Sequence, residues 1–366
     1  MSRHIGPQMN SLATLRTPNA LADAGLVRTA DIAALDAVAA RYAVAITPAV
    51  AELIEPGDGP LRRQFIPSVA ELTQTRDETA DPIGDDAHSP VEGIVHRYPD
   101  RVLLKPTHTC AVYCRFCFRR ETVGQATSKS LSKAGLDRAM AYIAGRPEIW
   151  EIIVTGGDPL ILSPRRLADI ARRLDDIAHV KILRFHTRVP VVEPERVTES
   201  LVGALTASSK TVWLAIHANC AEELTPQAAR AIGRLADAGV PLLGQTVLLR
   251  GVNDQPAALE RLMRRFVELR IKPYYLHHGD LAPGTSHFRT TLAEGQALAA
   301  NLRGRVSGLC QPTYVLDIPG GHGKAPIAAS HLLLEGDSAT VTDVNGHRHA
   351  YPPAPDKRSS GVRRRP

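Results

Sequence analysis

Cysteine and long apolar runs are both scarce in this sequence. Five cysteines among 366 residues do not make the dense disulfide framework of a small secreted domain. No stretch approaches the ~20 consecutive apolar residues that a membrane helix needs. We expect no signal peptide, because no basic start precedes an apolar run. These absences exclude a disulfide scaffold and a membrane span, and we expect the reducing cytoplasm as the compartment.

The rest of the composition is typical of a globular enzyme, with 44% hydrophobic and 22% charged residues. The formal net charge is +6, and part of this excess lies in the basic segment 357–366. A basic tail of this kind is typical of a solvated chain end. We therefore expect the residues after Pro352 to be disordered, and we expect no nucleic acid and no membrane as a partner.

The chain divides into three parts by composition and hydrophobic pattern. Residues 1–94 combine short Ala-rich helical patterns, such as 31–40, with an acidic stretch at 75–92 that we interpret as a linker or surface loop. Residues 95–330 alternate short apolar runs with helical stretches. Residues 331–366 contain an Asn-Gly dipeptide between two strand-like runs, which predicts a short hairpin ahead of the basic tail.

The middle part predicts an α/β fold with a parallel sheet, because strands alternate there with helices of 10–15 residues. We count about six such units, fewer than the eight of a closed (β/α)8 barrel. The predicted strands are 101–105, 149–155, 180–186, 211–217, 242–249 and 273–278. The predicted helices are 164–177, 198–206, 225–238 and 256–270.

Three cysteines, Cys110, Cys114 and Cys117, form a C-x3-C-x2-C triplet just after a predicted strand. Three thiolates can hold three irons of a [4Fe–4S] cluster and leave the fourth iron open to a ligand. The alternative is a structural zinc site, which needs a fourth ligand from elsewhere in the chain. The candidates for that ligand are His108, Cys220 and Cys310.

Two glycine-rich segments follow predicted strands. Gly156-Gly157-Asp158-Pro159 ends the strand at 149–155, and paired glycines let a ligand approach the backbone closely. The loop 317–324 ends in Lys324, which could contact a phosphate or form a Schiff base. It does not match a P-loop, because Ala325 follows the lysine. On local sequence alone, a surface turn with a solvated lysine is equally open.

Together, the triplet, the GGDP segment and the lysine loop resemble the lysine 2,3-aminomutase family of radical S-adenosylmethionine (SAM) enzymes. The resemblance runs from about residue 90 to 349. It implies a partial (β/α)6 radical-SAM barrel with an N-terminal helical extension and a short C-terminal hairpin and tail. It also implies an isomerase that uses a 5′-deoxyadenosyl radical and the imine of its substrate with pyridoxal phosphate (PLP) for a 1,2-amino shift.

The family's cofactor sites carry over position by position. The resemblance implies that Cys110, Cys114 and Cys117 hold the [4Fe–4S] cluster. It places Gly156, Gly157, Asp158, His217 and Gln245 at SAM. It makes Lys324 the catalytic lysine that binds PLP, with Arg97 and Arg101 near the PLP phosphate, where arginine suits phosphate.

The family's substrate contacts carry over as well. Arg119 matches the arginine that binds the α-carboxylate, and Asp280 and Asp317 match two carboxylates that receive the remote ammonium of lysine. The resemblance therefore implies interconversion of L-lysine and β-lysine. Two alternatives remain: another amino acid such as arginine, or a role in supplying β-lysine for modification of elongation factor P. Either aspartate alone could equally be a loop cap.

The sequence differs from those of the large family members in two features, one in the C-terminal part and one at a side chain near PLP. The cysteine-rich C-terminal segment of those enzymes is missing, and we interpret Cys220 and Cys310 as buried, apolar-like residues. His277 could replace a tyrosine near PLP or could be a core histidine. By analogy with the family, we expect a homo-oligomer and an electron donor such as a reductase, flavodoxin or ferredoxin.

Overall fold

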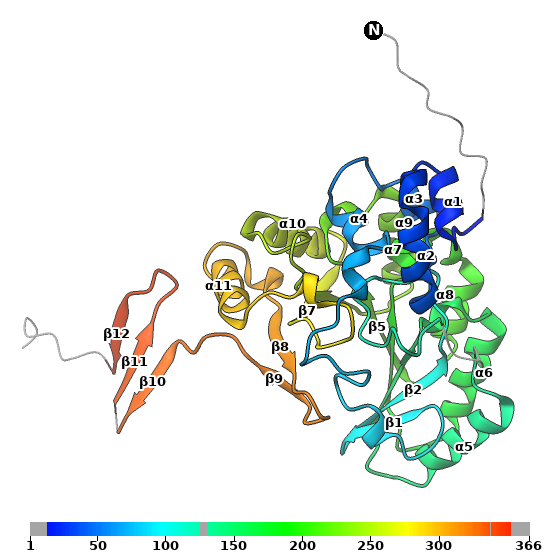
Figure 1. Ribbon diagram of the computed structural model, residues 1–366. Coiled ribbons are helices and arrows are strands. Elements are labelled where there is room, and N and C mark those ends of the chain that lie inside the picture. Colours follow the sequence, from blue (N-terminus) through cyan, green and yellow to red (C-terminus); the bar gives the residue numbers. More distant parts are fainter. Residues whose placement is uncertain (1–12, 125–129, 337, 353–366) are drawn as a thin grey trace, which may run out of the picture.

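The computed structural model describes residues 13–124, 130–336 and 338–352, and a nine-stranded sheet lies at its centre (Figure 1). The strands follow one another in chain order, so every strand pairs with its sequence neighbour. The inner pairs from β2 to β8 are parallel, and β1 and β9 close the two edges as antiparallel strands. The strands are β1 Ile94–Tyr98, β2 Arg101–Thr107, β3 Glu151–Gly156, β4 Ile182–Thr187, β5 Thr211–His217, β6 Leu242–Val247, β7 Ile271–His277, β8 Thr313–Asp317 and β9 Lys324–Pro326.

Helices cover the outer face of this curved sheet (Figure 1). Several of them begin with side-chain N-caps, since the side chains of Ser132, Ser163, Thr198 and Thr225 each accept a bond from a backbone N–H of the first turn. The helices are α5 Lys133–Ala144, α6 Pro164–Asp175, α7 Val189–Val192, α8 Glu199–Thr206, α9 Pro226–Asp237, α10 Pro256–Glu268 and α11 Leu292–Leu302. The expected α/β partial barrel is confirmed, with six connections joining seven parallel strands.

The predicted strands and helices of the barrel agree with the structure to within a few residues, but several elements were not expected. Strands β1 and β8 and helices α5 and α11 lie in stretches for which no element was predicted. The edge strand β9 holds only Lys324–Pro326, which is too short for an apolar pattern to mark it.

Four short helices precede the sheet, as expected for the N-terminal part. They are α1 Pro18–Asp23, α2 Ile32–Arg41, α3 Pro48–Ala51 and α4 Pro60–Phe65. Their apolar residues, among them Leu21, Val50 and Phe65, belong to the same hydrophobic core as the barrel. The division of the chain at residues 94 and 330 remains a prediction.

The stretch 75–92 connects these helices to β1, and its interpretation as a linker or surface loop is wrong for the residues that point inward. Asp85 and Glu78 are buried. Glu78 accepts bonds from the backbone N–H groups of Thr75 and Gly284 and pairs with Arg289. The acidic composition therefore reflects partners inside the protein as well as contact with water.

A separate three-stranded antiparallel sheet ends the described chain (Figure 1), and Val344 of its hairpin lies against Gly304, just after helix α11. Strands β11 (Ser338–Thr342) and β12 (Arg348–Tyr351) form the expected hairpin around Asn345 and Gly346, and β10 (Leu332–Glu335) adds a strand that was not expected. The predicted disordered tail after Pro352 lies outside the described residues. None of the helices in the described part has the length and apolar character to cross a bilayer.

Short 3-10 helices complete the described elements. They are Thr29–Asp31, Val69–Leu72, Asp86–His88, Pro159–Ile161, Pro194–Arg196, Ala221–Glu223, Ser286–Phe288 and Gly308–Cys310.

Candidate active site

A cavity of about 570 Å³ is lined by residues of the nine-stranded sheet and its loops. Residues from every strand, β1 to β9, or from the loop after it contribute to its wall. Because all the parallel strands point the same way, their carboxyl ends bring distant loops to one place. Of the residues singled out from the sequence, the cavity is lined by Arg97, Arg101, Cys110, Cys114, Cys117, Arg119, Gly157, Asp158, His217, Gln245, Asp280, Asp317 and Lys324.

The three cysteines come from the loop that follows β2, and all three are free thiols. Burial raises the pKa of each thiol, to about 11 for Cys117. The buried guanidinium of Arg188 donates a hydrogen bond from Nη1 to Sγ of Cys114 at 2.7 Å. The loop therefore presents three neutral sulfurs to the cavity, with a positive charge beside one of them.

Gly156 and Gly157 allow this cysteine loop to approach β3. A Cβ on Gly157 would lie 2.2 Å from the carbonyl oxygen of Thr109, and a Cβ on Gly156 would lie 2.6 Å from that of Thr107. The sequence suggested that a ligand needs this space, whereas the chain's own backbone fills it. Gly157 lines the cavity, but Gly156 is not among the lining residues.

Asp158 joins the ends of β3 and β4. Its carboxylate accepts bonds from the Thr187 hydroxyl at 2.7 Å and from backbone N–H groups of Leu160, Arg188 and Val189. Burial raises the pKa of Asp158, against the effect of these bonds. With four donors from the protein, this carboxylate orients the segment that carries Arg188.

His217 ends β5, and Gln245 lies beside it on β6, where the two residues are register partners. Nε2 of His217 lies 3.0 Å from Oδ1 of Asn219. Burial and the nearby Arg188 lower the pKa of His217 to about 3, so the ring is neutral at physiological pH. These side chains offer neutral polar groups to the middle of the cavity.

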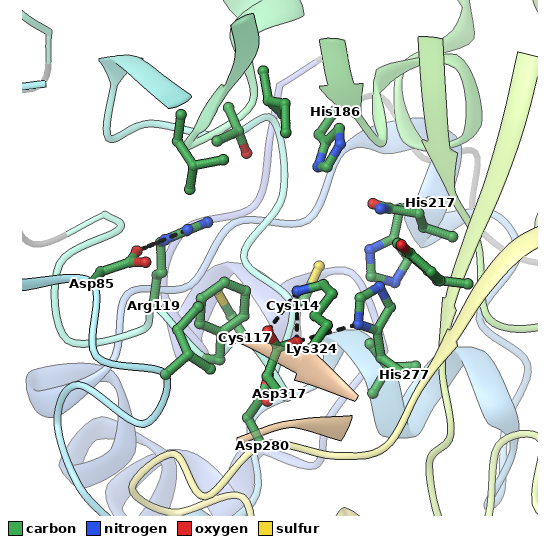
Figure 2. Close-up of a pocket in the computed structure, with 18 of the residues that line it drawn as sticks. Asp85, Cys114, Cys117, Arg119, His186, His217, His277, Asp280, Asp317 and Lys324 are labelled. Atoms are coloured by element: carbon green, nitrogen blue, oxygen red, sulfur yellow. Dashed lines mark hydrogen bonds and ion pairs between the residues drawn. The ribbon is translucent and has the colours of Figure 1, made fainter. Parts of the chain in front are cut away.

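Asp317 and Lys324 face each other across the antiparallel pair β8–β9 (Figure 2). Nζ of Lys324 lies 2.5 and 2.7 Å from the two carboxylate oxygens of Asp317. Nδ1 of His277 lies 3.6 Å from the same carboxylate. Burial alone would raise the pKa of Asp317, but His277 and Lys324 outweigh it and lower the pKa to about 2. His277 lines the cavity, and its role near PLP stays a prediction.

Asp280 lies in the loop after β7, near this pair (Figure 2). Its Oδ1 is buried, and none of the described residues donates a hydrogen bond to it. Burial and the neighbouring negative charge of Asp317 raise its pKa to about 7. The cavity therefore holds one carboxylate that is already paired with a cation and a second that is not.

Arg97 lies on the edge strand β1, and Arg101 lies on its neighbour β2. Arg97 donates from Nη2 to Asp85 at 3.0 Å, and its Nη1 lies 3.9 Å from Asp317. Arg101 stacks on the ring of Tyr98, and the hydroxyl of Tyr98 accepts the backbone N–H of Lys324 at 2.8 Å. Two guanidinium groups and one phenol thus lie around the start of β9.

Asp85, like Arg188, is a residue of the site that the sequence analysis missed. Its Oδ2 accepts a bond from Nε of Arg119 at 2.9 Å and lies 2.8 Å from Nη2 of the same residue. Burial would raise the pKa of Asp85, but Arg119 and Lys105 more than offset that effect and lower it. A stretch that reads as an acidic loop gave no signal that one of its carboxylates points inward.

Comparisons with known proteins agree with this geometry. The model of the radical SAM superfamily matches residues 104–263, which include the cysteine triplet and GGDP. The L-lysine 2,3-aminomutase of Clostridium subterminale is 42% identical over 300 residues, covering 81% of this chain and 72% of the relative. That of Fusobacterium nucleatum is 40% identical over 319 residues, covering 84% of this chain and 75% of the relative. The glutamate 2,3-aminomutase of Clostridioides difficile is 36% identical over 301 residues, covering 82% of this chain and 71% of the relative.

This chain belongs to the lysine 2,3-aminomutase family. It is therefore a radical SAM isomerase of the amino acid 2,3-aminomutase type, and its cofactors are a [4Fe–4S] cluster, SAM and PLP. The finding favours the cluster over the zinc alternative for the cysteine triplet. Cys220 and Cys310, offered above as zinc ligands, are buried as expected. Among the described residues, no three His, Cys, Asp or Glu side chains could hold a single metal ion.

The residues of the cavity fit the family's cofactors. Three cavity-lining thiols are the donor set that leaves one iron of a [4Fe–4S] cluster open. Lys324 offers a primary amine to the cavity, and arginines stand nearby for a phosphate. A lysine 2,3-aminomutase fold thus accounts for every sequence motif that the aminomutase resemblance used.

Proposed function

We propose that this enzyme interconverts L-lysine and β-lysine. The observation that carries the proposal is the pair of carboxylates, Asp280 and Asp317, at one end of the cavity. Buried carboxylates are stabilised by charge-assisted hydrogen bonds from a cation. An amino acid whose side chain ends in an ammonium supplies such a cation, and lysine is the simplest of these.

Lys324 itself supports this assignment. Its ammonium, on a four-carbon stem, lies against Asp317 at 2.5 Å, where we propose the remote ammonium of the substrate binds. When Lys324 is engaged with the cofactor, Asp317 loses this partner while Asp280 still has none. A substrate ammonium between the two carboxylates would restore the balance of charge.

The other roles follow from the same cavity. We propose that Cys110, Cys114 and Cys117 hold the cluster, that Lys324 binds PLP, and that Arg97 and Arg101 approach its phosphate. For SAM, we propose Gly156, Gly157, Asp158, His217 and Gln245. When bound, these cofactors supply the adenosyl radical and the π-system that lets nitrogen migrate between adjacent carbons. The protein binds and orients the substrate, with Arg119 for its α-carboxylate, and the enclosed cavity excludes water.

Glutamate and arginine are the competing substrates. Glutamate would bring a third carboxylate close to Asp280 and Asp317, and negative charges in one buried pocket repel each other. Arginine carries a cation, but its guanidinium is planar and broader than an ammonium. The carboxylate pair therefore favours lysine over glutamate strongly and over arginine by shape.

The test is product analysis with the reconstituted enzyme. The protein is loaded anaerobically with iron, sulfide and PLP and incubated with SAM, a reductant and L-lysine, L-arginine or L-glutamate in separate reactions. We expect β-lysine from lysine, identified by chromatography and mass spectrometry, and no β-amino acid from glutamate. SAM cleavage without β-lysine would retain the radical enzyme and reject the substrate. Lys324→Ala serves as the inactive reference.

A further inference from the structure

Asp85 bridges two arginines that line the same cavity: Arg97 on strand β1 and Arg119 in the loop after β2. Oδ2 of Asp85 pairs with Nε and Nη2 of Arg119, and Oδ1 of Asp85 accepts a hydrogen bond from Nη2 of Arg97. All three residues are at least largely buried, with side-chain exposures of 9% for Asp85, 9% for Arg97 and 14% for Arg119. Buried pairs of this kind have fixed geometry, because each guanidinium has few other ways to satisfy its N–H groups.

The contact uses only one edge of the Arg119 guanidinium. Nε and Nη2 face Asp85, and the hydrogen bonds found among the described residues leave Nη1 to the cavity that Arg119 lines. Figure 2 shows Asp85 on the side of Arg119 that faces away from Lys324. A guanidinium held by its Nε edge presents its Nη1–Nη2 edge for a second, bidentate carboxylate.

The loop that carries Asp85 does not need the Asp85 carboxylate for its own conformation. Asp81 accepts the backbone N–H groups of Asp85 and Asp86, both at 2.8 Å, and the Ser89 hydroxyl donates to the carbonyl of Asp85. The conformation of residues 81–89 is thus fixed by other groups. The Asp85 side chain is free to act on the two arginines.

The same loop is clamped to the segment that leads to Lys324. A Cβ on Gly84 would lie 2.5 Å from the backbone nitrogen of Gly321, so the two chains touch with no room for a side chain. Nε2 of His88 lies 3.2 Å from the carbonyl oxygen of Gly321. One rigid loop therefore fixes the placement of Arg119 relative to the lysine-bearing turn.

We infer that Asp85 is a positioning residue for carboxylate recognition: it holds Arg119 by one edge so that the other edge receives the α-carboxylate of the amino acid substrate. The inference rests on the proposed role of Arg119 at that carboxylate. Removing the Asp85 charge frees Arg119 to rotate and leaves Arg97 and Arg119 to repel each other. The loss of a hydrogen bond to a charged group corresponds to about a 10- to 100-fold change in affinity.

The experiment measures binding without turnover. Holoenzyme loaded with iron, sulfide and PLP, with SAM but no reductant, is titrated by calorimetry with L-lysine and with L-lysinamide, which lacks the carboxylate. We expect Asp85→Asn to weaken L-lysine binding about 10- to 100-fold and lysinamide binding less than about 3-fold. Asp86→Asn is the matched control, since Asp86 is the exposed neighbour in the same loop and should bind both ligands like the wild type.

A double-mutant cycle with Arg119→Gln separates positioning from a general effect on the fold. If Asp85 acts through Arg119, Asp85→Asn causes no further loss of lysine affinity once Arg119 is replaced. An equal loss for lysine and lysinamide, an additive cycle, or unchanged binding in Asp85→Asn would each overturn the inference. If the wild type binds another amino acid in place of lysine, the substrate proposal fails, and the same cycle is run with that amino acid and its amide.

Discussion

Lys324 and Asp317 are direct partners in the antiparallel pair β8–β9, and both carboxylate oxygens of Asp317 lie within 2.7 Å of the lysine Nζ. The turn between them contains Gly320, Gly321 and Gly323, all with positive φ, and is closed by the bond from the Ile318 N–H to the Gly323 carbonyl. Left-handed backbone at three positions explains the glycines of this loop. The lysine is therefore held at a defined distance from the carboxylate that we assign to the substrate.

Lys324→Ala should abolish covalent attachment of PLP. The described cavity has no other lysine in its lining, so no second amine is placed to replace Lys324. We expect borohydride to fix PLP to the wild-type peptide that contains residue 324 and to leave the variant unlabelled, with amino migration reduced to background. Lys133→Ala, on the outer helix α5, should label like the wild type. A fixed PLP adduct in Lys324→Ala would contradict the assignment.

Asp280→Asn should make the stability of the cofactor-free protein less dependent on pH. The pKa of Asp280 in the folded chain is about 7, against 3.8 for the free side chain, so the folded state binds its proton more tightly than the unfolded state. This contribution is complete below pH 3.8 and is lost as the pH rises through 7. Between pH 5 and pH 8 the wild type should lose about 3 kcal/mol that the variant does not lose.

Chemical denaturation at the two pH values measures this difference. Asp36→Asn, which removes an exposed carboxylate on α2, should follow the wild type. Parallel curves for wild type and Asp280→Asn would show that the Asp280 carboxyl group titrates normally and would remove the argument for an unpaired carboxylate.

Gly157→Ala should displace the cysteine loop. The added Cβ would meet the backbone of Thr109 at 2.2 Å, one residue before Cys110, and backbone atoms cannot move aside as a side chain can. We expect a loss of about 1–3 kcal/mol in unfolding free energy and a reconstituted protein with less iron. Gly203→Ala, in helix α8 with nothing within 4 Å, should keep its iron and gain a few tenths of a kcal/mol. Full iron content in Gly157→Ala would show that the loop tolerates the shift.

Glu71→Gln should destabilise the contact between the N-terminal part and the cysteine loop. Glu71 is fully buried and binds Arg115 through Nε and Nη2 and Arg120 through Nη2. Removing one member of a buried ionic cluster leaves the others without compensation, at a cost of about 3–5 kcal/mol. Thermal unfolding against the exposed control Glu52→Gln measures the effect. A melting temperature equal to that of the control would mean that the three charges contribute nothing net.

The sequence predicted the barrel and the main motifs of the cavity because both depend on local patterns. Buried strands such as β5 and amphipathic helices such as α9 show their period directly. The cysteine triplet and the lysine loop are recognisable as short motifs. What these patterns share is that all their residues are near one another in the chain.

Asp85 and Arg188 could not be found in this way. Asp280 was named from the family resemblance, but its lack of a hydrogen-bond donor could not be predicted. Asp85 lies in a stretch whose composition is that of a solvated loop, and its two partners stand 12 and 34 positions away. Arg188 contacts Cys114 across 74 positions. Such side chains acquire their roles only when the sheet curls, and the same residues in a different loop would have been ordinary surface charges.

The bond between His88 and Gly321 spans 233 positions and joins a segment ahead of the sheet to one near its last strand. A nascent chain emerges from the ribosome N-terminal end first. Nearly the whole barrel is therefore synthesised before Gly321, the partner of His88 in the Asp85 loop, is present. Contacts of such long sequence separation form late. The placement of the Asp85 loop against the lysine-bearing turn is thus completed only when the last strands of the barrel are present.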